Sequence, residues 1–338
     1  MRKKITCFTG MMLAVAVLFS ATACSFRGEE ITISRKLNQS EVFSIDGQSF
    51  RVSEMKLLLL NNMNLHGESY GIDLLNNENL KVQKKLEKYL KEYCLEEATR
   101  VYSMVALAKS SDIALTDEEQ QIAQWAGEDC YQSLSDAEKE SLELSQSEVE
   151  DLYTNYALAQ KVYEMLVKDV NLEVSDDEAR VMQIRLIYNT DHSKIKKAKE
   201  QLDAQVEFSS VAANDNEAED ISLTLERGML PEEVETVAFA MEDGDISDII
   251  ESEDGYYILC CDSKFDEALT EEHKTDIAHE RKESAFHDVY DPFVQTLNSK
   301  LNEEVWDAIS IDELRDYETA NFYEIYDKYF ADEEFLVE

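Results

Sequence analysis

Apolar residues recur at helical spacing over a long stretch of the first third of the chain. Between Asn79 and Ala108 they fall on one face of a single predicted helix, at Leu80, Val82, Leu86, Tyr89, Leu90, Cys94, Ala98, Val101 and Val105. The preceding segment, VFSIDGQSFRVSEMKLLLL, predicts two short strands joined by an Asp46-Gly47 turn. A helix should follow them, with Ser53 as its N-cap and Glu54 as its first residue.

Four further helix starts carry a capping box, in which a hydroxyl accepts from the first-turn amides and a glutamate accepts from the amide of the cap. The pairs are Thr116 with Glu119, Ser135 with Glu138, Ser147 with Glu150, and Ser175 with Glu178. The chain contains only two prolines, Pro231 and Pro292, which fits long uninterrupted helices. The first half of the chain is therefore predicted to be largely helical.

The period changes from helical to strand-like at Val181, where VMQIRLIYNTD begins. A helix over about 193–205 and a second one over about 270–301 are predicted beyond it. The last aromatic stretch, YETANFYEIYDKYF, is also helical in its spacing. It is interpreted either as a helix that packs Phe322, Ile325 and Tyr329 onto the first half of the chain or as a dedicated binding helix.

The N-terminus has the pattern of a signal peptide, with three cations, an apolar run from about Met11 to Phe19, and small residues before Cys24. An uncleaved membrane anchor is the alternative, but the run is shorter than the roughly 20 residues that a span needs. Residues 21–23 and Cys24 resemble a bacterial lipobox. This resemblance implies a mature chain that begins at a lipidated Cys24 and is held at a membrane by its acyl chains.

The chain is strongly acidic, with a formal net charge of −41. Residues 1–23 hold three cations and no acid, so the mature chain carries 29 cations against 73 anions, formally −44. Nucleic acid is therefore excluded as a partner, because phosphate binding needs clustered cations. The surplus acid favours solubility, association with divalent cations or attraction of basic partners.

The cysteines and histidines do not form a recognisable metal or redox motif. Cys94 could pair with Cys130, whereas Cys260 and Cys261 are adjacent on a predicted strand and point to opposite faces. Structural thiols are the favoured interpretation. The five histidines lack metal-ligand spacing, and no nucleotide-binding, hydrolase or zinc motif is present, so neither a cofactor nor a metal is expected.

The stretch from Glu226 to Cys260 carries the most specific sequence motif in the chain. Its marked positions are Arg227, Gly228, Phe239, Met241, Gly244, Ile246, Ser247, Gly255 and Ile258. This pattern resembles the C-terminal half of a parvulin-type peptidyl-prolyl isomerase domain. The opening half of that family's pattern is matched at Val181, Leu186, Ile187, Thr190, Asp191, Phe208, Val211 and Ala212. The family's two histidines fall on Arg185 and Tyr257.

The helical half resembles the chaperone module of PrsA and SurA foldases. The matching positions are Ile45, Asp46, Gly47, Phe50, Ser53 and Glu54, followed by Ala108, Ile113, Thr116 and Glu119. The resemblance implies an α+β, mostly helical fold with an inserted parvulin-like domain and a C-terminal helix that returns to the helical module. The expected divisions are a signal peptide over 1–23, a tether over 24–40, the helical module over 41–174, the parvulin-like domain over 175–265, and returning helices over 266–338.

The same resemblance implies where a proline-containing substrate would bind. Leu230 and Val234 fall on the family's pocket methionine and phenylalanine, Leu225 falls near its loop aromatic, and Phe239 completes this apolar substrate cleft. The acid or thiol of the family falls on one of three residues, namely Asn216, Ala218 or Asp220. Arg185 and Tyr257 are expected on neighbouring strands, where they either contact each other as cation and phenol or only fill the space of the lost histidines.

These expectations describe a foldase lipid-anchored to the outer face of the cytoplasmic membrane in a bacterial cell envelope. It would bind unfolded or nascent secreted proteins, and the loss of both histidines predicts weak or absent isomerase activity. A homodimer is left open. The alternative is a non-enzymatic envelope scaffold or a solute-binding lipoprotein, although the latter normally needs two lobes of alternating strands and helices.

Overall fold

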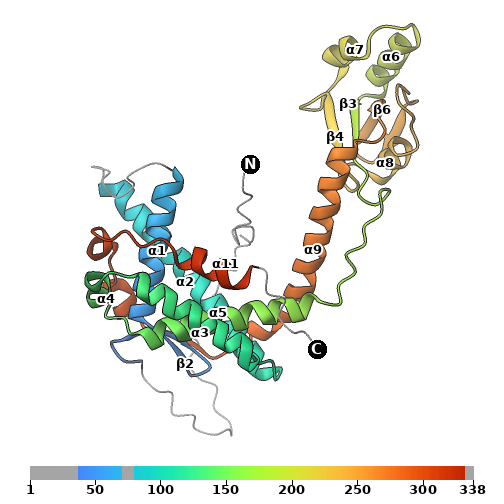
Figure 1. Cartoon of the computed structure of the whole chain (residues 1–338). Helices are drawn as coiled ribbons and strands as arrows, with labels where there is room; N and C mark the ends of the chain where they lie inside the picture. The colour runs from blue at the N-terminus through green and yellow to red at the C-terminus, as the bar shows by residue number, and fades with distance from the viewer. Residues whose placement is uncertain (1–36, 71–79, 332–338) are drawn as a thin grey trace, which may run out of the picture. The chain divides into compact units, whose positions relative to one another are not determined.

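The computed structural model describes residues 37–70 and 80–331 (Figure 1). The predicted signal peptide, Cys24 and most of the predicted tether lie outside the described residues. The mixed α+β, mostly helical fold is confirmed, with two small antiparallel sheets embedded among helices. Within the described ranges, no helix combines the length and the apolar character that a membrane span requires.

The first sheet has the strand order β2-β1-β7, from β1 (Glu41–Ile45), β2 (Gln48–Arg51) and β7 (Ser299–Leu301). The predicted Asp46-Gly47 turn joins β1 to β2, and both of its residues have positive φ, 46° and 82°. β7 corrects the prediction of a helix that continues to Leu301. The apolar residues before Leu301 recur at helical spacing, yet Leu301 itself pairs with Phe43 on the open edge of β1.

Five helices follow in the helical module: α1 (Val52–Tyr70), α2 (Leu80–Ser110), α3 (Asp117–Ser133), α4 (Asp136–Leu142) and α5 (Gln146–Val167). α2 confirms the long helix predicted from apolar spacing. The first sheet packs on α2 through Tyr102, whose ring meets Phe43 and Phe50 edge-on at 5.5 and 5.3 Å. α3 approaches α5 closely at Gly127, where an added Cβ would lie only 2.5 Å from the Cα of Glu150.

Two of the predicted capping boxes, at Thr116 and Ser135, are confirmed. The third is formed by Ser145 with Glu148 rather than by Ser147 with Glu150, so α5 begins two residues earlier than predicted. The fourth motif does not begin a helix. Ser175 accepts from the Glu178 amide at 3.1 Å within a turn.

The second sheet has the order β4-β3-β6-β5, from β3 (Met182–Asn189), β4 (Ser222–Leu225), β5 (Ile250–Ser252) and β6 (Gly255–Ser263). α6 (His192–Asp203) and α7 (Phe208–Asp215) cover one face, and α8 (Glu232–Ala238) covers the other. Each face has its own apolar core. Residues 181–263, which contain this sheet and its three helices, are called here the sheet domain.

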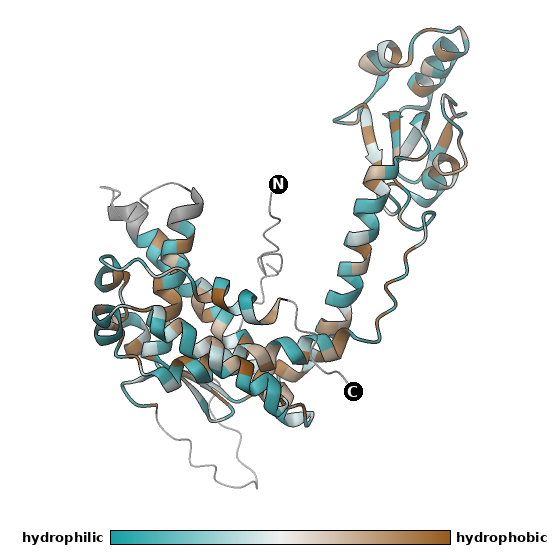
Figure 2. Ribbon diagram, in the orientation of Figure 1, coloured by the Kyte–Doolittle hydropathy of each residue, from teal (hydrophilic) through white to brown (hydrophobic). Residues whose placement is uncertain are grey.

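α9 (Glu267–Val294) contacts both the sheet domain and the helical module. At its start, Thr270 Oγ1 accepts from the Val181 amide at 3.2 Å. Further along, the buried Phe286 ring lies 5.4 Å from that of Tyr163 on α5. Figure 2 shows the stretch between these contacts as largely hydrophilic. There Arg281 donates to two carbonyls of the segment that precedes the sheet domain, those of Asn171 and Glu173.

The chain returns to the helical module after α9. α10 (Glu303–Ala308) and the 3₁₀ helix η1 (Ile311–Leu314) precede α11 (Phe322–Phe330), which packs on α3 (Figure 1). Phe322 and Ile325 are buried, as the interpretation of α11 as a packing helix predicts. Phe330, not Tyr329, is the third buried apolar residue. Tyr329 is half-buried, and its hydroxyl donates to the Asp129 carboxylate at 3.4 Å.

Candidate functional site

The predicted substrate cleft lies on the α8 face of the sheet domain. Leu225 on β4 and Val234 on α8 are completely buried in the core on that face. Leu230 and Phe239 are half-buried at the edge of the same core. α8 packs against β5 and β6, so the four residues do not form an open cup. Leu225 and Val234 are covered, and only Leu230 and Phe239 reach the surface.

Two arginines cover the Phe239 ring. The Arg227 guanidinium lies 4.3 Å from the ring centroid, and the Arg180 guanidinium lies 5.2 Å from it. Arg180 also donates to the Phe239 carbonyl, while Arg227 donates to the Asp177 carboxylate at 2.9 Å. The turn that precedes β3 is therefore tied to the rim of the predicted cleft. Arg180 and Asp177 lie outside the motif and are not among the predicted site residues.

An open hollow of about 320 Å³ adjoins Phe239. It is lined by Arg227, Glu232, Glu235, Thr236, Phe239 and Ala240. The Glu235 carboxylate accepts from the Leu230 amide at 3.0 Å, which fixes the loop that enters α8. The hollow thus offers one aromatic ring and charged side chains of both signs, in place of a purely apolar cup.

Tyr257 and Arg185 lie on neighbouring strands but face opposite sides of the sheet. Arg185 lies opposite Cys260 and Tyr257 opposite Tyr188, an offset of three residues that reverses the side-chain direction. The proposed contact between cation and phenol is therefore wrong. Arg185 forms a bidentate pair with Asp262, at 2.7 and 2.9 Å, on the α7 face.

The Tyr257 hydroxyl donates to the Asp254 carboxylate at 2.6 Å, and its ring lies 4.9 Å from that of Tyr188. Burial, followed by the hydrogen bond and charge of Asp254, raises the pKa of Tyr257 above its ordinary value of 10. The phenol consequently stays neutral at physiological pH. Its proton is already engaged, so Tyr257 in this arrangement does not offer a free donor to a bound amide.

The three candidates for the family's acid or thiol position have different environments. The Asn216 side-chain oxygen accepts from the amides of Tyr188 and Ala218, at 2.9 and 3.1 Å, and so fixes the loop to β3. Ala218 packs on the core, and Asp220 is exposed. Asn216 is thus the candidate with a defined positioning role.

The described cysteines are free thiols, at Cys94, Cys130, Cys260 and Cys261, and all are buried. Cys94 and Cys130 therefore do not form the disulfide that the sequence allows. Burial raises the pKa of Cys130 to about 11 and that of Cys261 also to about 11. Both remain protonated, and this favours a packing role over redox chemistry.

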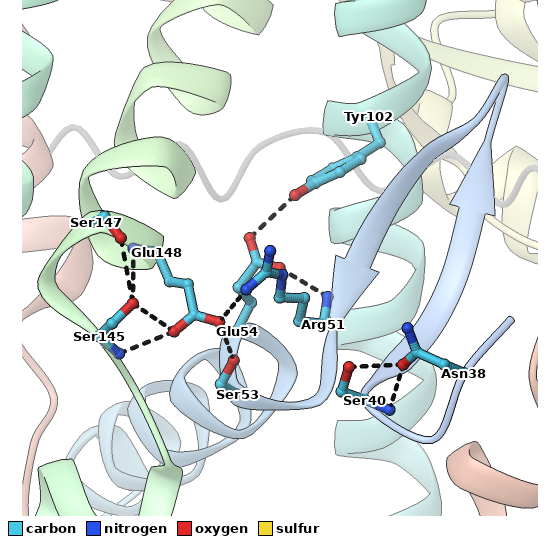
Figure 3. A network of polar contacts seen from close by, with 9 residues as sticks. All are labelled: Asn38, Ser40, Arg51, Ser53, Glu54, Tyr102, Ser145, Ser147 and Glu148. Carbon is cyan, nitrogen blue, oxygen red and sulfur yellow. Dashed lines mark hydrogen bonds and ion pairs between the residues drawn. The ribbon is translucent and has the colours of Figure 1, made fainter.

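A polar network joins the first sheet to α1, α2 and α5 (Figure 3). α1 begins at Val52, so Ser53 is not its cap; its hydroxyl donates to Glu148 instead, at 3.1 Å. Glu54 accepts from the Arg51 amide at 2.7 Å and from the Tyr102 hydroxyl at 3.0 Å. Burial raises the pKa of Glu54 to about 7. Glu54 matches a family position in the sequence, but the burial that raises its pKa depends on the tertiary fold.

Residues 159–271 match the family model of the PPIC-type PPIase domain. The chain contains a PPIase-family domain. The matched range covers the whole sheet domain, together with the end of α5 and the start of α9. The PPIase domain thus includes Arg180, Phe239 and Tyr257, and the segment that ties it to α9.

Solved structures of several foldases are similar to this chain. PrsA from Bacillus cereus is 18% identical, with 82% of this chain and 99% of that chain covered and a TM-score of 0.35. PrsA from Streptococcus pneumoniae is 17% identical, with coverage of 86% and 100% and a TM-score of 0.30. A SurA-like chaperone from Campylobacter jejuni is 12% identical, with coverage of 78% and 98% and a TM-score of 0.26. No curated protein matches the sequence.

Proposed function

We propose that this protein is a membrane-anchored folding factor of the bacterial cell envelope that binds unfolded or nascent secreted proteins. The observation that supports this proposal is a PPIase-family domain inserted into a helical module, which β7 and α11 complete from the far side of the insertion. A prolyl isomerase acts on the peptide bonds of other proteins, so its natural partner is an accessible, unfolded chain.

Isomerase activity is proposed to be weak or absent. Rotation of a prolyl bond crosses a barrier of about 18–20 kcal/mol, and catalysis requires the twisted amide to be bound better than the planar one. In this domain Tyr257 is committed to Asp254, and two guanidinium groups cover the Phe239 ring. Leu230 and the part of Phe239 that the two arginines leave exposed remain as the surface for a proline ring.

The test is a proline-limited refolding assay together with suppression of aggregation of an unfolded protein. The parent is compared with Leu230→Ala/Phe239→Ala, and with Val206→Ala as a matched control, because Val206 is 42% exposed elsewhere in the same domain. We expect little acceleration of refolding, clear suppression of aggregation, and no effect of the control. A parent protein that neither accelerates refolding nor suppresses aggregation would refute the folding-factor proposal and favour a scaffold.

The membrane anchor is proposed to be a lipid on Cys24. Its support is the signal-peptide pattern and the small residues at 21–23. Cells that express Cys24→Ala should release the protein from the membrane fraction and lose incorporation of a labelled fatty acid, whereas Cys94→Ala should change neither. Membrane retention of Cys24→Ala would contradict the lipid anchor.

A further inference from the structure

The segment from Tyr317 to Phe330 is held by polar side chains that bind its main chain. On α1, Asn61 Oδ1 accepts from the Phe322 amide at 2.9 Å, and Asn64 Nδ2 donates to the carbonyls of Tyr317 and Thr319, each at 3.0 Å. On α5, the Tyr153 hydroxyl donates to the Phe322 carbonyl at 2.7 Å. Contacts of this kind depend on the backbone of the bound segment and are therefore available to other sequences.

The groove that receives α11 also takes up apolar side chains at helical spacing. Phe322, Ile325 and Phe330 are 0%, 8% and 2% exposed. The Phe322 ring lies 4.7 Å from that of Tyr153 and 5.2 Å from that of Tyr156, both on α5. An amphipathic helix laid into an apolar groove is a recurring mode of peptide recognition.

The rest of the seam is unusually polar for a permanent core. Tyr323 and Tyr156 donate to the same Glu97 carboxylate of α2, at 2.6 and 2.8 Å, and burial raises the pKa of Glu97. At the outer edge, Lys328 pairs with Asp129 of α3 at 2.6 Å. Asn61 Nδ2 is buried and has no hydrogen-bond acceptor among the described residues. The seam thus retains one donor that a different occupant could satisfy.

Release of α11 would leave both described sheets fully paired. α11 contributes no strand to either described sheet, and β7, which closes the first sheet, precedes it in the chain. Its departure therefore breaks no strand pairing. It would expose Tyr153 and Tyr156 together with the asparagine side chains of α1.

We propose that the groove between α1, α3 and α5 is a binding site for amphipathic helical segments of client proteins, and that α11 is its internal occupant. The identity of the occupant as a client rests on the proposed folding function; the exchange of α11 does not. A client segment would replace α11 by presenting apolar residues at positions equivalent to Phe322, Ile325 and Phe330. Its backbone would take over the contacts to Asn61 and Asn64.

The experiment locks α11 in place in the purified protein. Asp129→Cys/Lys328→Cys is joined by a cleavable thiol-specific crosslinker, since the native described cysteines are buried. Lys56→Cys/Glu313→Cys is the matched control, because that ion pair of 3.4 Å joins α1 to η1 outside the groove. The probe is a fluorescein-labelled synthetic peptide of residues 317–331, whose binding is followed by anisotropy.

A tethered segment competes at millimolar effective concentration, so binding is also measured in Phe322→Ala, which weakens the internal occupant. We expect Phe322→Ala to bind the peptide at least about tenfold more tightly than the parent, because the lost side chain is fully buried. The Asp129–Lys328 crosslink should weaken binding at least about tenfold relative to the same protein after cleavage. The control crosslink should have no effect. Equal peptide binding by the locked and cleaved forms would overturn the proposal, even if aggregation is still suppressed.

A permanently unfolded, reduced and alkylated protein then competes with the peptide. Competition supports a client as the natural occupant. Peptide exchange without competition would refute that assignment. Failure of the folding function is recognised separately, as an absence of aggregation suppression in the parent protein.

Discussion

The protonation of Glu54 makes the stability of the helical module depend on pH in an unusual direction. Glu54 is 4% exposed, and burial raises its pKa from an ordinary 4.5 to about 7. The folded module therefore retains a proton that the unfolded chain releases. The stabilisation linked to this proton is fully present below pH 4.5 and is lost as the pH rises through 7. Its full size is about 3 kcal/mol, from about 1.4 kcal/mol for each unit of pKa.

The perturbation is Glu54→Gln, which resembles the protonated acid. The amide oxygen can accept from the Arg51 amide, and the amide nitrogen can donate to the Tyr102 oxygen. We expect the variant and the parent to have similar stability at pH 5. At pH 8 the variant should be more stable by about 3 kcal/mol, because the parent must bury an ionised carboxylate there.

The assay is urea unfolding followed by tryptophan fluorescence. The chain has two tryptophans, Trp125 in α3 and Trp306 in α10, so the signal reports on the helical module and not on the PPIase domain. Glu96→Gln is the matched control, since Glu96 is exposed on α2 and its substitution removes the same charge from an acidic chain. If Glu54→Gln stabilised the module equally at pH 5 and pH 8, or no more than the control at pH 8, the reasoning would be refuted.

Further predictions concern the packing of α3 on α5 and the cleft of the PPIase domain. Gly127→Ala should destabilise the helical module by about 1–3 kcal/mol in urea unfolding, because its Cβ would lie 2.5 Å from the Glu150 backbone, whereas Glu128→Ala on the exposed side should change little. Lys161→Met should lower the free energy of unfolding by about 3–5 kcal/mol, because it removes the cation that lies 2.7 Å from the buried Glu119 carboxylate. Lys161→Met/Glu119→Gln should recover much of this loss. A double variant as unstable as Lys161→Met would contradict this account. In the PPIase domain, Arg180→Ala should remove one of the two guanidinium groups over the Phe239 ring and increase binding of a labelled prolyl peptide in a fluorescence titration, whereas Lys264→Ala at an exposed ion pair should not.

Features with a local cause could be predicted from the sequence. The Thr116 and Ser135 capping boxes need only residues three positions apart, and α2 needs only one apolar face. The segment SQSEVE contains two overlapping boxes, and local chemistry does not choose between them. Ser145 is chosen because its partner Glu148 also pairs with Arg51, which lies 97 residues earlier in the chain.

The candidate site depended on contacts that the sequence does not contain. Alignment placed Arg185 and Tyr257 on neighbouring strands, but only the register of β3 on β6 shows that they face opposite sides. Likewise, Leu225 and Val234 were recognised as apolar, but their complete burial depends on how α8 lies on the sheet. Arg180 lies outside any motif, and its contact with Phe239 spans 59 residues of sequence.

The strand β7 determines the order in which the parts of this protein can fold as the chain is synthesised. β1 begins at Glu41 but acquires its second neighbour only when residues 299–301 arrive, after the entire PPIase domain has been synthesised. The strands of the PPIase domain, in contrast, all lie between Met182 and Ser263 and can pair as soon as that stretch emerges. The part that begins the chain is therefore the last to be completed. Until residues 299–301 have been synthesised, the edge of β1 that β7 covers has no strand partner.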